Sequence, residues 1–257
     1  MPVPSAPRKT DDRVRLDELL VLRGLYATRS RARDAVERGA ISVDGAVVAK
    51  PGQAVPLSSV IAADDPAARY VSRAALKLLA GLDHFGLDPE GSEVLDIGAS
   101  TGGFTQVLLE RGAAHVTAFD VGHGQLDRRL RDDPRVTAIE GLNARDLTVE
   151  HLGGKSPDFV VSDVSFISLT LALPPALSLA APGARGLFLV KPQFEAGREA
   201  IGKGGILKDP AEGPRIAEKL RAWLDAQAGW RALGVCDSPV AGGDGNREFL
   251  LGGIKDR

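Results

Sequence analysis

The feature that most constrains the fold is an apolar segment that runs into a glycine-rich turn and then into a second apolar segment. Residues 92–97 have the composition of a buried β-strand, and the turn at residues 98–103 holds three glycines. The apolar residues 107–109 indicate a helix after the turn, with Thr101 or Thr105 as its cap. Glycines let a ligand approach the backbone closely, and a helix N-terminus directs its free N–H groups toward that ligand. This stretch therefore predicts a cofactor site on a strand–turn–helix unit.

The residues around the turn favour S-adenosylmethionine over a dinucleotide. Ser100 occupies the place of the second glycine in the fingerprint G-x-G-x-x-G, where the backbone must let a pyrophosphate approach. Asp96, just before the turn, suits the positively charged amino group of an amino-acid moiety. Asp120 ends the next predicted strand, at the spacing at which an acidic residue binds a ribose diol. A turn of this kind can also serve only close packing of strand and helix. The predicted cofactor contacts are Asp96, Gly98, Ser100, Gly102, Gly103, Phe104 and Asp120.

Composition predicts one large domain and a small one. The chain has 257 residues, of which 44% are hydrophobic, enough for a full core. The net charge of −2 argues against a general polyanion-coating protein, although residues 1–50 carry ten Lys and Arg against seven Asp and Glu. The single cysteine, Cys236, excludes an internal disulfide framework, and the four histidines lack metal-ligand spacing. We therefore predict no structural metal.

The sequence gives no sign of export or of a membrane span. Residues 1–12 are polar and proline-rich and are expected to form a disordered lead-in instead of a secretory signal. The longest apolar tract, residues 169–181, is interrupted by Pro174 and Pro175 and is shorter than the ~18 residues of a membrane helix. We expect a cytoplasmic protein with no membrane partner and no evident stable protein partner.

Two short helices and a hairpin are predicted after the lead-in. Residues 16–23 show helical spacing of leucines, and residues 30–39 suit a second helix with Ser30 as its cap. Apolar residues alternate at 41–43 and 46–48 around an Asp-Gly pair, which is a strong hairpin signal. The residues of the second helix predicted to be buried are Ala32, Ala35 and Val36. The arginines that must then face solvent are Arg29, Arg31 and Arg33.

These elements resemble the alpha-L RNA-binding module, the S-four fold of ribosomal proteins, pseudouridine synthases and tyrosyl-tRNA synthetases. The resemblance covers about residues 13–60 and rests on R-L-D-E-L-L at 15–20, T-R-S-R-A-R at 28–33 and G-A-I-S-V-D-G at 39–45. It implies binding of structured RNA. The arginines that would contact the RNA are Arg15, Arg29, Arg31 and Arg33. The alternative is a solvated charged helix face that binds nothing.

Strand and helix signals alternate from residue 70 onward, which is the mark of a doubly wound sheet. Helices are predicted at residues 74–85, with Lys77 off the apolar face, and at 210–228. A closing antiparallel hairpin is expected at one edge, as in class I methyltransferases and unlike nucleotide dehydrogenases. The seven predicted strands are residues 93–97, 115–120, 135–139, 158–163, 186–191, 231–238 and 247–252.

The predicted fold class is therefore α/β, a class I methyltransferase-type doubly wound, mostly parallel seven-stranded sheet with a small N-terminal α+β RNA-binding domain. The predicted divisions are a lead-in at 1–12, the RNA-binding module at 13–62, a linker at 63–69 and the methyltransferase domain at 70–257.

Charged residues at the carboxyl ends of the strands are the main candidates for chemistry, because ligands of open α/β sheets bind there. Asp163 ends one predicted strand and Lys191 ends another, and an unpaired buried charge at either place would be costly. Lys77 and Glu248 are weaker candidates. Each of these two in isolation is expected to be a solvated surface charge.

Five segments in order resemble the TlyA (hemolysin-A-type) rRNA methyltransferases, which belong with the FtsJ-like ribose methylases. The segments are S-R-A-A-L-K-L at 72–78, D-I-G-A-S-T-G-G-F-T at 96–105, S-D-V-S-F-I-S-L at 162–169, V-K-P-Q-F-E at 190–195 and G-N-R-E-F at 245–249. The resemblance implies methyl transfer from S-adenosylmethionine to a ribose 2′-hydroxyl, typically of cytidine in ribosomal RNA, with ribosomal subunits as partners. It also implies a catalytic tetrad. The matching residues are Lys77, Asp163, Lys191 and Glu248.

The same resemblance adds Asn143 and Asp163 to the predicted cofactor contacts. Gly141 and Leu142 precede Asn143 here, where the family pattern leads us to expect an arginine and a threonine. This departure weakens the assignment of Asn143 to the adenine side of the cofactor.

The tetrad suits ribose methylation. A ribose hydroxyl is a poor nucleophile, and in-line attack on a sulfonium methyl requires that its proton be removed or shared. We assign Lys191 as the base. Burial and the Lys77 cation favour loss of the Lys191 proton, whereas Asp163 and Glu248 favour its retention. If Lys191 stays protonated, it and Lys77 would instead stabilise the developing oxyanion.

Other features and functions have alternatives. Phe166 and Phe194 could stack on a base, but core packing is the expected use of both. The basic, glycine-rich segment 202–208 could be a mobile flap over RNA phosphates or a plain connector. An NAD-dependent oxidoreductase is disfavoured by Ser100. A non-catalytic RNA-binding or ribosome-assembly factor is disfavoured by four charges at one sheet edge, and a hemolysin by the lack of a membrane-active stretch.

Overall fold

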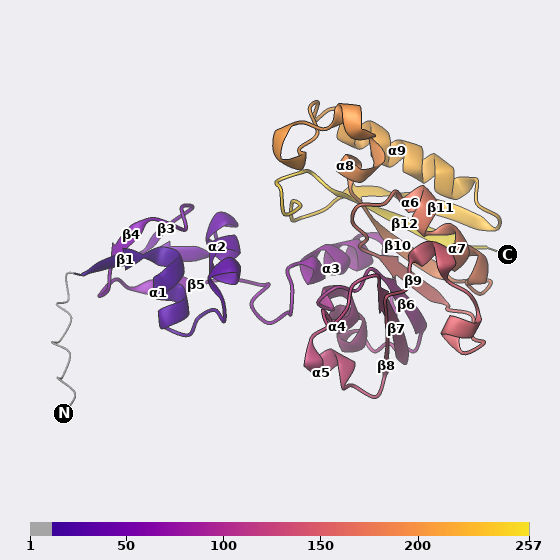
Figure 1. Ribbon diagram of the computed structural model, residues 1–257, viewed down its shortest axis with the longest axis horizontal. Helices are drawn as coiled ribbons and strands as arrows, with labels where there is room; N and C mark the ends of the chain where they lie inside the picture. The colour runs from indigo at the N-terminus through magenta and orange to yellow at the C-terminus, as the bar shows by residue number, and fades with distance from the viewer. Residues whose placement is uncertain (1–11, 257) are drawn as a thin grey trace. The chain divides into compact units, whose positions relative to one another are not determined.

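The computed structural model describes residues 12–256, which form two compact units divided between Arg69 and Tyr70 (Figure 1). Each unit has an apolar core of its own. The predicted lead-in at residues 1–12 lies, apart from Asp12, outside the described residues.

The N-terminal unit combines two helices with two small antiparallel sheets. Its elements are β1 (Arg13–Arg15), α1 (Leu16–Leu22), α2 (Arg29–Glu37), β2 (Ile41–Val43), β3 (Ala46–Val47), β4 (Ala54–Pro56) and β5 (Ile61–Ala63). Strand β1 pairs with β4, and β2 lies between β3 and β5. The predicted hairpin is confirmed: β2 and β3 are joined by Asp44 with φ 51° and Gly45 with φ 85°, the positive values that a two-residue turn requires. The predicted buried face of α2 is confirmed as well.

Helix α2 begins one residue earlier than predicted. Thr28 is its N-cap, because the Thr28 hydroxyl accepts a hydrogen bond from the Arg31 N–H at 3.3 Å. The Thr28 backbone is extended, as an N-cap requires, whereas Ser30 lies inside the helix. The predicted cap at Ser30 is therefore wrong.

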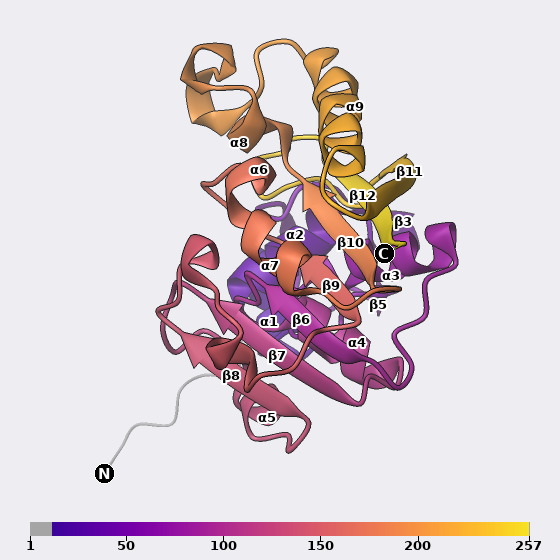
Figure 2. The same ribbon diagram turned by 90° about the vertical axis from the view of Figure 1, so that its right-hand side faces the viewer.

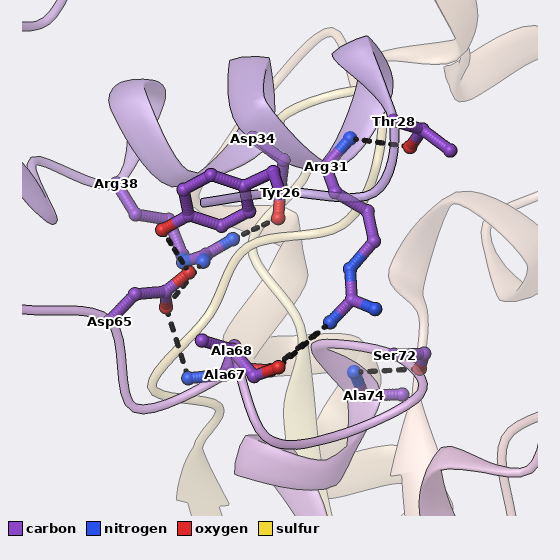
Figure 3. A network of polar contacts seen from close by, with 10 residues as sticks. All are labelled: Tyr26, Thr28, Arg31, Asp34, Arg38, Asp65, Ala67, Ala68, Ser72 and Ala74. Atoms are coloured by element: carbon purple, nitrogen blue, oxygen red, sulfur yellow. Dashed lines mark hydrogen bonds and ion pairs between the residues drawn. The ribbon is translucent and has the colours of Figure 1, made fainter. Parts of the chain in front are cut away.

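Side chains of the N-terminal unit bind part of the segment 63–69 that was predicted as a linker (Figure 3). Asp65 accepts a hydrogen bond from the Tyr26 hydroxyl at 2.9 Å and another from Arg38 at 2.7 Å. Burial alone would raise the pKa of Asp65, but hydrogen bonds from Arg38 and Tyr26 hold it below its usual value. Tyr26 and Arg38 thus hold this segment within the N-terminal unit.

Arg31 serves the same segment. Its guanidinium donates to the carbonyl oxygens of Ala67 at 3.5 Å and Ala68 at 3.3 Å (Figure 3). Arg31 is therefore half-buried and used within the unit, in contrast to the predicted solvent-facing position. Arg29 and Arg33 are exposed, as predicted.

The second unit is a seven-stranded sheet in the order β11-β12-β10-β9-β6-β7-β8 (Figure 2). Its strands are β6 (Glu93–Ile97), β7 (His115–Asp120), β8 (Val136–Glu140), β9 (Phe159–Ser162), β10 (Arg185–Val190), β11 (Trp230–Asp237) and β12 (Phe249–Lys255). Strands β6 to β10 run parallel to one another, and β12 is antiparallel to both β10 and β11. The predicted α/β fold with a closing antiparallel hairpin is confirmed.

Helices cover both faces of this sheet (Figure 2). Helices α3 and α4 share one apolar cluster with the sheet, and α6, α7 and α9 share the cluster on the other face. The helices are α3 (Ala74–Phe85), α4 (Gly103–Glu110), α5 (Arg128–Arg131), α6 (Leu169–Ala172), α7 (Pro174–Leu179), α8 (Pro192–Glu195) and α9 (Glu212–Asp225). Short 3-10 turns are η1 (Ala144–Asp146), η2 (Glu150–Leu152), η3 (Arg198–Ala200) and η4 (Lys203–Gly205).

Two local predictions in this unit are wrong. Helix α4 has Gly102 as its N-cap and no side-chain cap, because the Thr105 hydroxyl donates instead to Asp96. In α3, Lys77 lies on the buried face with Leu78, not off it. The reason is that Lys77 has a carboxylate partner inside the protein.

Candidate active site

Strand register brings the predicted site residues to one edge of the sheet. Ile97 of β6 is opposite Ser162 of β9, Ser162 is opposite Phe188 of β10, and Val190 of β10 is opposite Phe249 of β12. Strand β12 runs opposite to β6, β9 and β10. The residue that precedes β12 therefore lies at the same edge of the sheet as the residues that follow these three strands. These edge residues are Gly98, Asp163, Lys191 and Glu248.

Lys77 and Glu248 form a buried ion pair. The distance from Lys77 Nζ to Glu248 Oε2 is 2.5 Å, and the side chains are 7% and 2% exposed. Both were expected to be solvated charges when considered alone, and this expectation is wrong because each neutralises the other. A Cβ atom on Gly242 would lie 2.6 Å from Glu248 Oε1, so a larger residue there would force the carboxylate or the turn before β12 to shift.

Lys191 and Asp163 form a second ion pair at the same edge. Lys191 Nζ lies 2.6 Å from Asp163 Oδ1 and donates a hydrogen bond to Ser165 Oγ at 2.8 Å. The Lys191 and Asp163 side chains are 11% and 17% exposed, so both are more accessible than the first pair. The structure thus brings the four tetrad residues together as two lysine–carboxylate pairs. Sequence reasoning missed Ser165, although it lies within the segment that carries Asp163.

The glycine-rich turn approaches this edge closely. Gly98 has φ 81°, and a Cβ atom on it would lie 2.9 Å from the carbonyl oxygen of Asp163. Both facts require glycine at this position. Gly103 is constrained on the other side, where a Cβ atom would lie 2.5 Å from Ser72 Oγ. Gly102 faces away from the edge, toward Leu126 and Leu130 of the core.

Asp120 holds the turn in place. Its two carboxylate oxygens accept hydrogen bonds from the Ser100 N–H at 2.9 Å and from the Gly122 N–H at 2.8 Å. Ser100 has φ 47°, which is uncommon for a residue other than glycine, and its hydroxyl donates to Gln125 at 3.2 Å. Asp120 therefore fixes the backbone of the residue that replaces the fingerprint glycine.

Asp96 is fully buried below the turn. One carboxylate oxygen accepts a hydrogen bond from the Thr105 hydroxyl at 2.6 Å, and Oδ1 has no hydrogen-bond partner among residues 12–256. Burial raises the pKa of Asp96 to about 7, and the charges of Asp163 and Asp120 add to the effect. The side chain is thus more enclosed than the sequence alone indicated.

A pocket of 860 Å³ opens beside these residues. Of the predicted cofactor contacts, Gly98, Ser100, Asp120, Asn143 and Asp163 line it. Apolar side chains, including Val121 and Leu142, form part of its wall. Gly103 and Phe104 line a separate, smaller cavity, and Phe104 is also part of the core.

Asn143 lies at the wall of the pocket but also has a local role. Its side-chain oxygen accepts hydrogen bonds from the Arg145 N–H at 3.1 Å and from Arg145 Nε at 3.2 Å. It therefore caps the short turn η1.

Phe166 is the most exposed aromatic side chain near the site. It is 90% exposed and has φ 65°, so the expectation of core packing is wrong for this residue. Its ring lies 5.0 Å from that of half-buried Phe194, and both line the pocket. The two rings, tilted by 50° to each other, offer an apolar surface next to Asp163.

The glycine-rich segment 202–208 is held by hydrogen bonds, unlike a plain flexible connector. Asn246 accepts from the Leu207 N–H at 3.0 Å and donates to the Gly205 carbonyl at 2.9 Å. Asn246 is buried and lies two residues before Glu248. Sequence reasoning did not assign this side chain, although it belongs to the segment G-N-R-E-F.

The sheet order, the antiparallel last strand and the charged edge beside a glycine-rich turn define a class I-type methyltransferase. Residues 70–255 match the FtsJ-like methyltransferase family, and residues 14–61 match the S4 domain. TlyA of Mycobacterium tuberculosis, a 16S/23S rRNA (cytidine-2′-O)-methyltransferase, is 45% identical over 93% of this chain and 89% of its own. Hemolysin A of Brachyspira hyodysenteriae is 38% identical over 92% of this chain and 98% of its own.

A solved structure from Streptococcus thermophilus, provisionally named a hemolysin, aligns with a TM-score of 0.72. It is 40% identical in sequence and covers 95% of this chain and 88% of its own. The chain belongs to the FtsJ-like methyltransferase family and to its TlyA and hemolysin A branch, which carries an S4 domain. Membership of this family implies S-adenosylmethionine as the methyl donor. Among residues 12–256, no helix is long and apolar enough to span a bilayer.

Proposed function

We propose that this chain transfers a methyl group from S-adenosylmethionine to the 2′-hydroxyl of a cytidine ribose in ribosomal RNA. The observation that carries the proposal is the position of Lys191, whose Nζ lies 2.6 Å from Asp163 and 2.8 Å from Ser165, two residues that line the pocket of 860 Å³. Relatives that are named for this reaction support the choice of substrate.

The residues around the pocket fit S-adenosylmethionine. Gly98, which has no side chain to fill the cradle, leaves room beside Asp163, and Asp120 presents a carboxylate suited to a ribose diol. Leu142 and Asn143, which line the pocket, would face the adenine. Asp96 does not line the pocket, but its buried, unpartnered Oδ1 suits the amino-acid end. When bound, the cofactor supplies an electrophilic methyl group on a sulfonium.

Lys191 is the residue that would contact the ribose hydroxyl. Asp163 and Ser165 fix its Nζ, so the lysine orients the hydroxyl without a loss of side-chain freedom during the reaction. As a base, Lys191 would accept the hydroxyl proton once it has passed its own proton to solvent. As an ammonium, it would stabilise the negative charge that develops on the oxygen.

Lys77 and Glu248 brace the site. Their pair joins α3 to the start of β12, next to the end of β10 that carries Lys191. Because both side chains are buried, they would keep the edge rigid and add little direct contact with the RNA. Phe166, exposed beside Asp163, would stack on the target base and hold it out of its helix.

We propose that the RNA-binding module (residues 13–62) docks ribosomal RNA, that residues 63–69 connect it, and that residues 70–257 carry the reaction in the cytoplasm. Within the docking surface, Arg33 is exposed, and Arg15 and Arg29 are exposed while paired with Asp17. Arg31 would contribute indirectly, because its guanidinium holds Ala67 and Ala68.

The test is transfer of labelled methyl from S-adenosylmethionine to separated, undermethylated small and large ribosomal subunits, followed by mapping of the labelled nucleotide. Label on a ribose 2′-oxygen of cytidine is expected, and Lys191→Ala should abolish it. Lys155→Ala, which removes an exposed lysine at the opposite edge of the sheet, is the matched control and should retain activity. If the cofactor binds but neither subunit is labelled, the proposal fails and a non-catalytic assembly factor becomes the better interpretation.

A further inference from the structure

Glu195 joins two loops that carry the site residues. It lies at the end of α8, four residues after Lys191, and both of its carboxylate oxygens accept hydrogen bonds. Oε2 accepts from the Ser168 hydroxyl at 2.6 Å, and Oε1 accepts from the Leu169 N–H at 2.8 Å. One side chain therefore links the segment after β10 to the segment after β9.

The segment held in this way is the loop at residues 163–168. It begins with Asp163, contains Ser165 and Phe166, and ends at the two partners of Glu195. Lys191 binds the beginning of the loop through Asp163 and Ser165, whereas Glu195 binds its end. The loop is thus fixed at both ends by residues of the single segment 191–195.

The conformation of this loop needs such support. Phe166 has φ 65°, a left-handed value that residues other than glycine rarely adopt, and its ring is 90% exposed. Burial of Phe166 therefore cannot hold the backbone. Phe194, the neighbour of Glu195, contacts Phe166 with ring centroids 5.0 Å apart, so a shift of α8 would also move the aromatic pair.

We propose that Glu195 is a positioning residue that sets the distance between Lys191 and the loop of Asp163 and Phe166. This inference rests on the proposed function, because it assumes that Lys191 and Asp163 act in methyl transfer. Glu195 touches neither the reacting atoms nor the pocket of 860 Å³. It acts by holding the geometry, and misplacement of reacting groups by about 1 Å can cost ~10²-fold in rate.

The two hydrogen bonds of Glu195 predict different outcomes for three substitutions. Glu195→Gln can keep both bonds, because its oxygen can accept from Leu169 and its amide can donate to Ser168. The Ser168 hydroxyl would then turn toward Thr170 Oγ1, which lies 2.8 Å away. Glu195→Asp is one methylene shorter and cannot reach both partners, and Glu195→Ala removes both bonds.

The first experiment measures single-turnover methyl transfer to undermethylated ribosomal subunits at saturating cofactor. Glu195→Ala and Glu195→Asp should lower the rate ~10- to 100-fold with cofactor affinity within about twofold of the native chain. Glu195→Gln should remain within about threefold. Glu218→Ala is the matched control, since Glu218 is an exposed carboxylate of α9 bonded to Arg221, and it should be silent.

Amide hydrogen exchange gives a result that does not depend on catalysis. Exchange at Leu169 and in residues 163–168 should accelerate in Glu195→Ala and stay unchanged in Glu195→Gln. Native exchange and a native rate in Glu195→Ala would overturn the inference, and so would equal rate losses in the Gln and Ala variants. Should Glu195→Ala not fold, Glu195→Asp provides the same comparison. If the native chain transfers no methyl group, the proposed function fails. The exchange data alone then decide whether Glu195 holds the loop at residues 163–168.

Discussion

Two lysine–carboxylate pairs lie at the same sheet edge, yet they differ in access. Lys77 and Glu248 are 2.5 Å apart and nearly closed to solvent, whereas Lys191 and Asp163 are 2.6 Å apart and border the pocket through Asp163 and Ser165. Lys191 has a second partner in Ser165 that a substrate hydroxyl could replace. The same pair of charged groups can therefore brace a site when it is closed and act on substrate when it is reachable.

The largest effect should follow from removal of the reachable lysine. Lys191→Met keeps most of the side-chain volume but cannot bind or share a proton, so methyl transfer should fall ~10²- to 10⁴-fold. Single-turnover assays would measure the rate, and calorimetry would measure cofactor binding, which should persist. A variant that keeps more than about a tenth of the native rate would show that Lys191 is not the reacting lysine.

Removal of one partner of the closed pair should act first on stability. Glu248→Leu leaves the Lys77 ammonium buried without a counter-charge, which should lower the free energy of unfolding by ~3–5 kcal/mol. Denaturant unfolding of the full chain would measure the loss.

The double variant Lys77→Met with Glu248→Leu is the control for that measurement. It removes both charges and should recover most of the stability, because an apolar pair of similar volume avoids the desolvation cost. A bracing role predicts that the recovered protein regains part of its activity as well. A double variant that is stable and fully inactive would show that this pair also takes part in the chemistry.

Much of the fold follows from the sequence because its signals are local. The seven strands and α3 are set by apolar periodicity, and the edge position of Asp163 and Lys191 follows from the rule for parallel strands. Pairing is not local. Lys77 and Glu248 are 171 residues apart, so helical periodicity places Lys77 on a polar face and only the folded chain shows its partner.

Other parts of the site escaped prediction for the same reason. The exposure of Phe166 depends on a loop fixed by Lys191 and Glu195, which belong to another strand end. The cap of α4 is absent because Thr105 bonds to Asp96 on β6. Residue type indicated which chemistry was present, but side-chain partners across the fold decided which groups are buried and which are reachable.

Asp96 differs from the carboxylates of the two ion pairs, because it is buried with no lysine partner. Its pKa of about 7 lies above the unfolded value, so the folded chain binds this proton more tightly than the unfolded chain does. Stability from this group is complete below about pH 4 and is lost as pH rises through about 7, at up to ~1.4 kcal/mol per pH unit. Asp96→Asn should flatten this decline in denaturant unfolding.

Thr105→Val is the control for the Asp96 measurement. The Thr105 hydroxyl donates a hydrogen bond that favours the ionised form of Asp96. Thr105→Val removes this bond, so the decline in stability should extend to higher pH. If Asp96→Asn leaves the pH profile of stability unchanged, the Asp96 carboxylate stays ionised in the folded chain.

The smallest effect is expected in the N-terminal unit, where closed and reachable charges can be compared again. Asp17 is fully buried between Arg15 and Arg29, at 3.0 and 3.1 Å, whereas Arg33 is exposed on the next helix. Burial alone would raise the pKa of Asp17, but hydrogen bonds from the two arginines hold it below its usual value.

Arg33→Gln should weaken RNA binding and reduce the slope of log affinity against log salt by ~1, with no change in stability. Arg29→Gln should reduce the slope similarly and also cost ~1–3 kcal/mol of stability, because Asp17 keeps only one of its two partners. Filter binding at several salt concentrations and unfolding of the full chain would measure both effects. Equal stability of the two variants would mean that Arg29, like Arg33, serves only the RNA.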